Sequence, residues 1–413
     1  MASERVRPRR QRDNPCEKRT LENPQTPLVR GSKIKGSAVP SLARHRSGNK
    51  LTIRRSEHEL AVMTIDNLPS VHADDEWSPL KAVIVGRAGR ACFPSAPAEM
   101  IEATMPSQHV HRFQPRAPFD EKLIAKAEAE LDLFSAILEA EGVRVHRPPT
   151  GIDWLSIDGY TGAMPRDGLM SVQNTLIEAC FAWRCRDREI EIGYEPILDL
   201  LAQDPRVNIV RRPPHAFANT LLDDDGSKSK QWTINNSRPA FDTADFMRFG
   251  RTIIGQYSHV TNQAGIDYVQ QHLPPGYKIE ILDVDDPHAI HIDTTILPLR
   301  EGLLIYHPLK VTEAALRRHE VFADWDLRPY PYVPRESGHP PLYMTSPWLC
   351  LNALVLDGER VVVEASDYKT AEWYESLGMK CIPCPFKHVN SVGGSFHCAT
   401  VDLVREKSKS KAE

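Results

Sequence analysis

The sequence has few cysteines, no long apolar run and no glycine-rich phosphate loop, and each absence excludes a class of protein. No apolar run approaches the roughly 18 residues that a membrane-spanning helix needs, which excludes an integral membrane protein. Eight cysteines in 413 residues are too few for a disulfide scaffold and favour a reducing compartment. Because no glycine-rich loop follows a predicted strand, a nucleotide cofactor has no support. The composition also excludes collagen-like, coiled-coil and fully disordered classes.

Proline is abundant, and charge is unevenly distributed along the chain. The 33 prolines are about 8% of the residues against a usual value of roughly 5%, which predicts a loop-rich fold with many short elements. The net charge of −4 hides an asymmetry. Residues 1–55 carry 15 Lys and Arg against 4 Asp and Glu, whereas the remainder carries 36 against 51. A basic segment therefore precedes an acidic body.

Residues 1–60 are expected to form a disordered basic tail. The stretch Arg5–Arg12 has no periodic apolar positions, and Ser, Gly, Asn and Pro recur as far as Lys50. A secretory signal is disfavoured because no apolar stretch follows the charges. A cytoplasmic location is favoured, with a mitochondrial presequence as the alternative because the tail is rich in Arg. Nucleic-acid binding is disfavoured because no aromatic platform accompanies the arginines.

Residues 70–406 are expected to form one α/β domain, because helical and strand patterns alternate without an internal linker. Asp120 caps a predicted helix with an apolar face, Gly142 ends this helix, and a strand follows at 143–147. The same order of helix, glycine and strand recurs with uneven spacing. The further predicted elements are helix-to-strand segments at 266–282 and 371–383, strands at 81–86, 302–306, 361–365 and 396–403, and a helix at 243–256.

Cys398 is a candidate nucleophile. Gly393 and Gly394 precede it and let the backbone approach a ligand closely, and a cysteine in such a place is suited to nucleophilic catalysis. A buried structural cysteine is the alternative interpretation. His397 is a poor partner for Cys398, because adjacent residues of a strand point to opposite faces. A base must therefore come from elsewhere in the chain.

His291 and Asp293 supply an imidazole and a carboxylate two residues apart. If this segment is a strand, both side chains point to one face, about 7 Å apart at roughly 3.3 Å per residue. Such a pair offers a general base beside a receptor for a cation. An exposed pair at the end of a strand is the alternative interpretation.

Three further aspartates are candidates. Asp245 lies between apolar neighbours and is favoured over Asp242, which is expected to be a solvated helix cap. Asp167 follows Met-Pro-Arg in a predicted turn, where an aspartate is usually structural. A zinc site that uses Cys381 and Cys384 is disfavoured, because both lie on a predicted strand without the usual turn between them.

Eight short segments stand out in order over residues 76–405: Glu76-Trp77-x-Pro79-Leu80, Val83-Ile-Val-Gly-Arg87, Ala163-Met-Pro-Arg-Asp167, Ala182-Trp183-Arg184, Phe241-Asp-x-Ala-Asp-Phe246, Val260-Thr-Asn262, His291-Ile-Asp293 and Phe396-His-Cys398. Taken together, they resemble the arginine:glycine amidinotransferase family. The resemblance implies the pentein fold, an α/β propeller of five ββαβ-like modules around a pseudo-fivefold axis. It also implies that the site lies in the central channel.

The resemblance implies roles for five residues. Cys398 matches the nucleophile, His291 matches the general acid and base, and Asp245 matches the carboxylate partner of that histidine. Asp167 and Asp293 match the carboxylates that hold the guanidinium of the donor. Paired carboxylates suit a planar cation that is rich in N–H donors.

Three further positions lie where the family binds the carboxylate of the donor. Thr345 and Ser346 match the family there. Lys310 replaces an arginine, and a lysine lacks the bidentate fork of a guanidinium. On the acceptor side, the segment from His288 to Ile290 reads His-Ala-Ile rather than Asn-Pro-Met. Glycine is therefore a doubtful acceptor, and a specialised natural-product amine is at least as well supported.

The resemblance implies an amidinotransferase that moves the amidino group of L-arginine to a small-molecule amine. The reaction would pass through an amidino-cysteine, release L-ornithine and need neither a metal nor an organic cofactor. Members of the family are often dimers, so a homodimer is compatible with the resemblance. The alternatives are a guanidino hydrolase of the same fold, similar to arginine deiminase, a non-catalytic binding protein with a relict site, and an RNA-binding protein.

Overall fold

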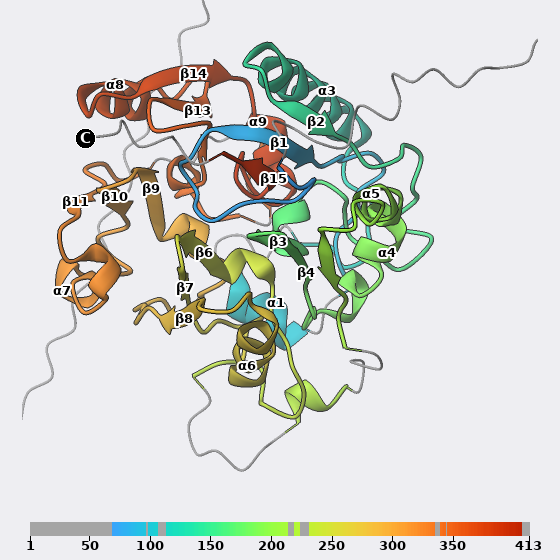
Figure 1. Cartoon of the computed structure of the whole chain (residues 1–413). Helices are drawn as coiled ribbons and strands as arrows, with labels where there is room; N and C mark the ends of the chain where they lie inside the picture. The colour runs from blue at the N-terminus through green and yellow to red at the C-terminus, as the bar shows by residue number, and fades with distance from the viewer. Residues whose placement is uncertain are drawn as a thin grey trace, which may run out of the picture. The chain divides into compact units, whose positions relative to one another are not determined.

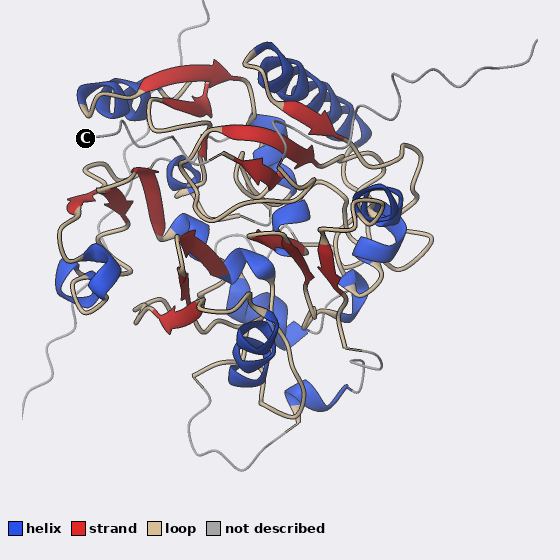
Figure 2. Ribbon diagram, viewed as in Figure 1, coloured by secondary structure: helices blue, strands red, loops and turns tan. Residues whose placement is uncertain are grey.

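The computed structural model describes residues 68–95, 98–105, 113–213, 219–223, 231–334, 339–343 and 345–406. The predicted tail, residues 1–60, lies outside these described residues. Within them, fifteen strands form five three-stranded sheets that surround a common centre (Figure 1). The helices α3, α5, α6, α7 and α8 lie outside the ring of strands (Figure 2). No helix of the described residues is long and apolar enough to cross a membrane.

Four of the five sheets of the described residues repeat one topology. The first two strands form an antiparallel hairpin, and a helical connection returns the chain to a third strand parallel to the second. In one module these elements are β6 (Phe246–Phe249), β7 (Thr252–Gly255), α6 (Gln263–His272) and β8 (Lys278–Ile281). The other internal modules are β3 (Leu169–Val172), β4 (Thr175–Glu178), α4 (Glu189–Gly193), α5 (Glu195–Leu201) and β5 (Asn208–Val210); β9 (Ile296–Arg300), β10 (Leu303–Tyr306), α7 (Glu313–Leu316) and β11 (Asp326–Pro329); and β12 (Leu354–Val355), β13 (Arg360–Glu364), α8 (Tyr368–Ser376) and β14 (Lys380–Cys384).

The fifth sheet joins the two ends of the ring. Strand β15 (Thr400–Arg405) pairs antiparallel with β1 (Leu80–Val85), which pairs parallel with β2 (Arg144–His146). Helices α3 (Glu121–Ala140) and α9 (Lys387–Val392) belong to this part of the fold, whereas α1 (Ala98–Thr104) packs through Met100 and Ile101 in a cluster with Trp183 and Val260. Because the last strand completes the sheet of the first, the ring is held shut by backbone hydrogen bonds. The predicted arrangement of five α/β modules is confirmed.

Local sequence signals explain helix α3. The carboxylate of Asp120 accepts hydrogen bonds from the backbone N–H groups of Lys122 and Leu123, both at 3.0 Å. The helix buries the predicted apolar face, and Gly142 follows its end with a φ of +87°, a conformation that glycine adopts without strain. The predicted helix is confirmed.

Two predicted elements are wrong. Residues 243–256 do not form a helix: a short 3-10 turn, Thr243–Asp245, leads into the β6–β7 hairpin, with Gly250 at its tip at a φ of +68°. Strand pairing is favoured over a helix there because both faces of the hairpin are buried. Strand β15 begins only at Thr400, and residues 396–399 form a turn.

The five modules are equivalent in one further respect: a tight turn precedes the first strand of each. These turns are η2 (Pro165–Asp167), η5 (Thr243–Asp245), η6 (Ile292–Thr294), η8 (Leu349–Leu351) and residues 396–399. Turn η5 contacts η2 and η6, and η6 also contacts η8. Residues far apart in the sequence are thereby brought together at the centre.

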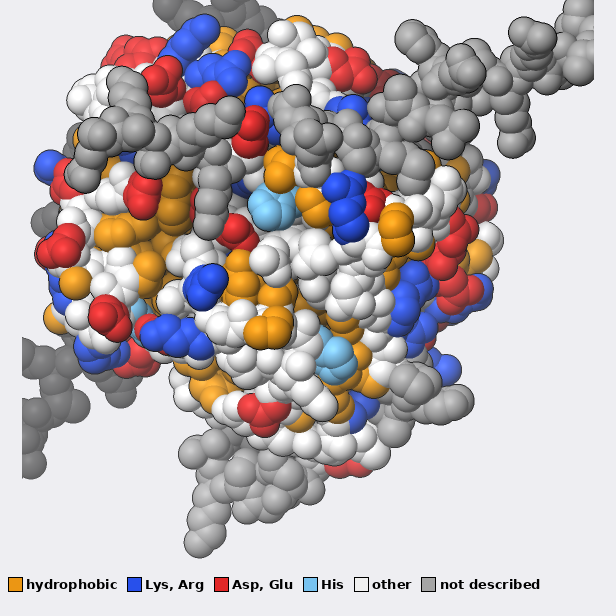
Figure 3. All heavy atoms as spheres, viewed as in Figure 1, with side chains coloured by type: hydrophobic (Ala, Val, Ile, Leu, Met, Phe, Trp, Pro, Cys, Tyr) orange, Lys and Arg blue, Asp and Glu red, His pale blue; other side chains and the backbone are white. Residues whose placement is uncertain are grey.

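The surface carries charges of both signs. On the face shown in Figure 3, acidic and basic side chains of the described residues are interspersed and do not form a continuous basic patch.

Candidate active site

A cavity of about 170 Å³ lies beside the turns at the centre of the ring. Its lining includes nine residues singled out from the sequence: Asp167, His288, Ile290, His291, Asp293, Lys310, Thr345, Ser346 and Cys398. Asp245 is not one of the residues that line it. The structure therefore brings most of the predicted site together, although its residues are spread along the sequence from Asp167 to Cys398.

Cys398 is buried, and its thiol faces both an amide and a carboxylate. Its Sγ accepts a hydrogen bond from Asn352 Nδ2 at 3.1 Å and donates one to Asp293 Oδ2 at 3.3 Å. Gly394 lets the backbone pass close to it, since a Cβ at this position would lie 2.9 Å from Sγ. Burial and the charge of Asp293 raise the pKa of Cys398 to about 12, so these surroundings keep the thiol protonated.

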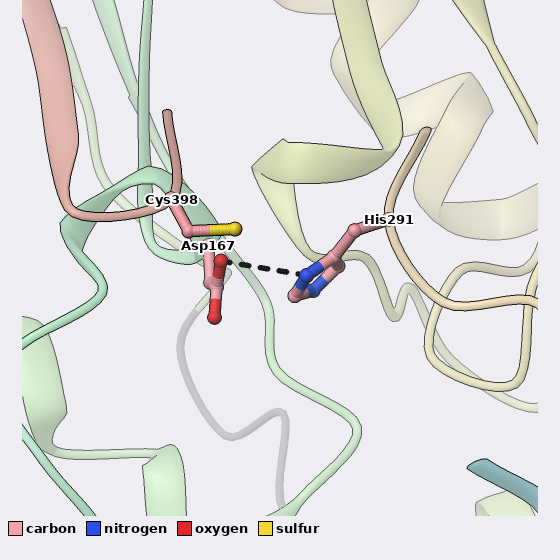
Figure 4. Close-up of side chains that lie close together, drawn as sticks. All are labelled: Asp167, His291 and Cys398. Carbon is pink, nitrogen blue, oxygen red and sulfur yellow. Dashed lines mark ion pairs between the residues drawn. The ribbon is translucent and has the colours of Figure 1, made fainter. Parts of the chain in front are cut away.

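His291 faces Cys398 and Asp167 across the cavity (Figure 4). Its Nε2 lies 3.0 Å from Asp242 Oδ2 and its Nδ1 lies 3.6 Å from Asp167 Oδ1. Burial alone would lower the pKa of His291, but Asp167 and the hydrogen bond to Asp242 raise it well above its ordinary value. The imidazole is therefore held as a cation that can donate a proton.

The carboxylate that bonds His291 is Asp242, whereas the sequence favoured Asp245 for this role and placed Asp242 in solvent. Asp242 is buried at the start of turn η5. Asp245 lies at the end of the same turn and accepts hydrogen bonds from Gln256 Nε2 at 2.9 Å and Ser258 Oγ at 2.7 Å. The 3-10 turn directs the two aspartates differently, which a predicted helix at 243–256 did not anticipate.

The sequence suggested that His291 and Asp293 lie on a strand, and this prediction is wrong. His291 has a φ of +61°, sparsely populated for residues other than glycine, and Asp293 lies within turn η6. The prediction that His397 and Cys398 diverge also fails, because residues 396–399 form a turn. Both side chains reach Asp293 Oδ2, His397 through Nδ1 at 2.8 Å.

Two carboxylate oxygens in the cavity are buried without a hydrogen-bond partner among the described residues: Asp167 Oδ1 and Asp293 Oδ1. The second oxygen of each is held, Asp167 Oδ2 by Arg186 at 2.9 Å and Asp293 Oδ2 by His397. Leaving a buried acceptor without a hydrogen bond costs about 1–3 kcal/mol. Fixed carboxylate oxygens of this kind beside a thiol suit a ligand that is a cation with several N–H donors.

The remaining predicted residues form other walls of the cavity. Lys310 Nζ lies 2.8 Å from Asp286 Oδ2, so its charge is already paired. Thr345 donates a hydrogen bond to the backbone oxygen of Asn390 at 2.8 Å, and Ser346 Oγ accepts one from the backbone of Trp348 at 3.2 Å.

The acceptor-side residues predicted from the sequence also line the cavity. His288 Nδ1 lies 2.6 Å from the backbone oxygen of Ala103, and Ile290 is half-buried. These contacts place the segment before His291 against the end of helix α1.

Sequence reasoning missed Arg186 and Asn352. Arg186 bonds Asp167 and also Asp242, at 3.3 Å, and so fixes the two carboxylates on either side of His291. Asn352 Oδ1 accepts the backbone N–H groups of Ser395 and Cys398, both at 3.1 Å. No local pattern marks Asn352, because its contacts are with Ser395 and Cys398, which are distant in the sequence.

The site also contains residue types that bind metals. Side-chain atoms of Asp167, His291 and Cys398 all lie within 4.8 Å of one another. A metal ion held there would have to displace the protons of the thiol and the imidazole. The same side chains are also those that proton transfer and nucleophilic chemistry use.

Comparison with known proteins identifies relatives along most of the chain. The chain is 38% identical to the L-arginine:L-lysine amidinotransferase of Pseudomonas savastanoi pv. phaseolicola over 344 residues, which cover 80% of this chain and 93% of the relative. It is 36% identical to the mitochondrial glycine amidinotransferase of Danio rerio over 361 residues, covering 81% and 83%. No family model matches the chain.

The fold is also similar to that of a solved amidinotransferase. The amidinotransferase of the saxitoxin biosynthetic pathway from Microseira wollei aligns with a TM-score of 0.72 at 34% identity, covering 82% of this chain and 98% of that one. The N-terminal domain of a cyanobacterial arginine dihydrolase aligns at 0.51 with 14% identity, covering 78% and 98%, a likeness of fold alone.

Proposed function

This chain belongs to the amidinotransferase family that includes glycine amidinotransferases and L-arginine:L-lysine amidinotransferase, and from this premise we propose how its site works. The proposed reaction moves the amidino group of L-arginine to an acceptor amine and releases L-ornithine. Cys398 carries the group between the two half-reactions.

One observation supports this proposal above the others: Asp167 Oδ1 and Asp293 Oδ1 lack hydrogen-bond partners among the described residues, in the cavity that also holds Cys398. A guanidinium offers N–H donors in a plane, so it can satisfy both oxygens while its carbon faces the sulfur. Holding the sulfur and the guanidino carbon next to each other makes their reaction effectively unimolecular, which lowers the barrier.

Binding of the cation also activates the nucleophile. Burial raises the pKa of Cys398, and the negative charges of Asp293 and Asp167 raise it further. A guanidinium between these carboxylates neutralises their effect, so the thiol releases its proton to solvent more readily when the donor is bound, while His291 keeps its own proton. The thiolate therefore forms where an electrophile is present.

In the first half-reaction, the thiolate of Cys398 attacks the guanidino carbon and forms a carbon–sulfur bond. The bond from that carbon to Nε of arginine then breaks, and the imidazolium of His291 protonates the departing nitrogen. Ornithine leaves, and a cationic amidino-cysteine remains on the enzyme. Asp242 stabilises the imidazolium beforehand through its hydrogen bond to Nε2.

The second half-reaction reverses these steps with another amine. The neutral acceptor nitrogen attacks the amidino carbon, His291 takes a proton from it, and the carbon–sulfur bond breaks to restore the thiolate. Glycine and L-lysine are named as acceptors for relatives of this chain. Lysine is the better candidate here, since the segment from His288 to Ile290 departs from the glycine-type pattern.

Product analysis tests the proposed reaction. The full chain is incubated with L-arginine labelled in the guanidino carbon, with and without a panel of amines that includes glycine and L-lysine. We expect ornithine and a labelled guanidino product that appears only with an accepted amine. Labelled citrulline without dependence on amine would instead identify the hydrolase.

We further propose that residues 70–406 form the catalytic domain, that the protein acts as a homodimer, and that it resides in the cytoplasm. The extent of the five modules supports the first of these. Activity of a chain that begins at residue 68, its mass in solution, and the location of the tagged full chain test them. Import of the full chain into mitochondria would favour the presequence alternative.

A further inference from the structure

We propose that Asn352 is a further catalytic residue of this site, because its side-chain N–H donates a hydrogen bond to the sulfur of Cys398 and stabilises the thiolate. The inference rests on the proposed function and deepens it, since it adds a group that touches the reacting sulfur in both half-reactions. Neither the sequence pattern nor the family resemblance assigned a role to Asn352.

Asn352 lies in direct contact with the nucleophile. It is fully buried and follows turn η8, which precedes the first strand of its module as residues 396–399 precede β15. Its Nδ2 lies 3.1 Å from Sγ of Cys398. The side-chain amide is therefore a buried hydrogen-bond donor at the atom that attacks the substrate.

The orientation of this amide is fixed by the backbone of the turn that carries the nucleophile. Its Oδ1 accepts the backbone N–H groups of Ser395 and Cys398, both at 3.1 Å. The backbone oxygen of Asn352 also accepts the N–H of His397 at 3.1 Å. Rotation of the amide by half a turn would set its NH2 group against two N–H donors and lose both bonds to Oδ1. Nδ2 therefore faces the sulfur before a substrate binds, so no reorganisation is needed when charge develops there.

The sulfur otherwise faces two negative groups and one positive group. Asp293 Oδ2 lies 3.3 Å away, and a carboxylate oxygen of Asp167 lies within 4.8 Å. Both negative charges disfavour a thiolate, whereas the hydrogen bond and charge of His291 favour it. Asn352 adds an uncharged donor to this set. Because a hydrogen bond to the charged form of a group favours that form, the amide acts in the same direction as His291.

His291 and Asn352 differ in what they can do during the reaction. His291 gives its proton to the departing amine, so its support of the sulfur changes as the reaction proceeds. A carboxamide does not titrate, and its N–H stays in place in both half-reactions. Hydrogen bonds to an ionised acceptor are about twice as strong as neutral ones, so Asn352 favours the thiolate over the amidino-cysteine. It therefore assists both the formation of the thiolate and its release in the second half-reaction.

The size of the effect follows from the strength of such a bond. A hydrogen bond to a charged group shifts an equilibrium by about 10- to 100-fold, so loss of the donor should lower the fraction of thiolate by this factor. The remaining thiolate is then more reactive, because nucleophilicity rises with pKa with a Brønsted β of about 0.5 in thiol–disulfide exchange. Loss of the donor alone should therefore slow the attack of the sulfur by about three- to ten-fold.

Substitution Asn352→Asp tests the donor. Aspartate has the same shape, and one of its oxygens can still accept the two backbone N–H groups, while the other sets a negative charge against the sulfur. The alkylation of Cys398 by iodoacetamide in the free protein is followed at pH 9 by mass spectrometry, and kcat/KM is measured for L-arginine. We expect alkylation to be at least about ten-fold slower and kcat/KM to be at least about 100-fold lower. A value of either quantity within about two-fold of that of the unaltered protein would overturn the inference, because Asn352 would then only hold the turn.

Substitution Asn262→Asp provides a matched control. Asn262 is also buried, its Oδ1 also accepts two backbone N–H groups, and its Nδ2 donates to two backbone oxygens rather than to the sulfur. It is not one of the residues that line the cavity. This variant should have a lower melting temperature but should keep the alkylation rate and kcat/KM within about two-fold of normal. Equal losses in Asn262→Asp and Asn352→Asp would contradict a specific role of the donor to the sulfur.

Substitution Asn352→Leu decides the question if Asn352→Asp does not fold. Leucine has a similar volume and lacks the donor. A protein that has lost only the donor should be alkylated about three- to ten-fold more slowly, whereas one whose turn has opened exposes the thiol to water and is alkylated faster. A slower rate in Asn352→Leu supports the inference, and an unchanged or faster rate overturns it.

The alkylation measurement also separates this inference from the proposed function, since it requires no turnover. Slower alkylation of Asn352→Asp, in a protein that releases no ornithine from L-arginine, would overturn the proposed function and leave the hydrogen bond to the thiolate supported. Release of ornithine by the unaltered protein, together with unchanged alkylation of Asn352→Asp, would overturn the inference and leave the proposed function in place.

Discussion

Two groups of buried charges meet at His397, and they differ in how completely they are paired. In the first group, Arg248 donates to both oxygens of Glu76, each at 2.7 Å, and to Asp402 at 2.5 Å. Arg166 and Arg405 also donate to Asp402, at 2.9 and 2.8 Å. We call these five residues the supporting network.

The cavity carboxylates, Asp167 and Asp293, form the second group. They are equally buried, but each keeps one oxygen without a hydrogen-bond partner among the described residues. His397 joins the two groups, since it bonds Asp293 through Nδ1 and lies 3.4 Å from Glu76 through Nε2. Burial of an acid therefore does not reveal its role. Pairing does, because a fully matched acid holds the turns in place and an unmatched one is available to a ligand.

The largest expected effect concerns the nucleophile. Cys398→Ser should lower the rate of ornithine release from L-arginine by at least about 10⁴-fold, because a hydroxyl is a far weaker nucleophile than a thiolate. Its melting temperature should stay close to that of the unaltered protein. Ornithine release within about ten-fold of normal would show that Cys398 does not carry the amidino group.

Breaking the supporting network should instead affect stability. Arg248→Met leaves Glu76 and Asp402 with fewer partners and should lower the free energy of unfolding by about 3–5 kcal/mol. Urea unfolding measures this loss. The exposed pair of Arg328 with Asp326 provides the control, since Arg328→Met should leave the free energy of unfolding almost unchanged. Equal losses of unfolding free energy in Arg248→Met and Arg328→Met would show that the supporting network contributes no more to stability than an exposed ion pair.

Asp167→Asn should have the opposite signature. Loss of the charge should lower kcat/KM for L-arginine by about 10²–10³-fold, because one receptor for the guanidinium is gone. Stability should be unchanged or higher, since an incompletely paired buried charge has been removed. Enzyme assays and urea unfolding of the same preparation check both parts. A variant that is destabilised as much as Arg248→Met would place Asp167 in the supporting network.

Asp242→Asn should act through His291. The charge and hydrogen bond of Asp242 raise the pKa of His291, so their loss should lower it. Because the protonated imidazole donates the proton to ornithine, activity is lost as pH rises through this pKa, and the variant should lose activity at a lower pH. We expect kcat to fall about 10²-fold at neutral pH. A larger shift of the pH profile in Asp245→Asn would restore Asp245 as the partner.

The last prediction concerns the free enzyme. With a pKa of about 12, the thiol of Cys398 should react with iodoacetamide about ten-fold faster for each unit of pH between about 7 and 10. Mass spectrometry of the peptide that contains Cys398 follows the reaction. A rate that is already constant above about pH 7 would show that the thiolate exists before the donor binds.

The sequence predicts an element well where local residues determine both of its ends. Asp120 and Gly142 mark the ends of helix α3, and both act within a few residues of themselves. The hairpin at 246–255 was mistaken for a helix because its short strands are stabilised by pairing and burial, which a local pattern does not report.

The site was predicted unevenly for a similar physical reason. The resemblance located Cys398 and His291, but two aspartates three residues apart, Asp242 and Asp245, could not be distinguished without the geometry of turn η5. Arg186 was missed because its role depends on meeting Asp167 and Asp242 in space. These contacts depend on the short turns between modules. The spacing of residues in the sequence does not predict the directions in which these turns orient their side chains.

Trapping the covalent intermediate tests the central claim most directly. The protein is mixed with guanidino-labelled L-arginine in the absence of an acceptor, quenched in acid and digested, and the peptide that contains Cys398 is examined by mass spectrometry. The account predicts a labelled amidino group on Cys398 that disappears when L-lysine is added before the quench. Turnover of L-arginine with no label on Cys398 at any time would contradict it.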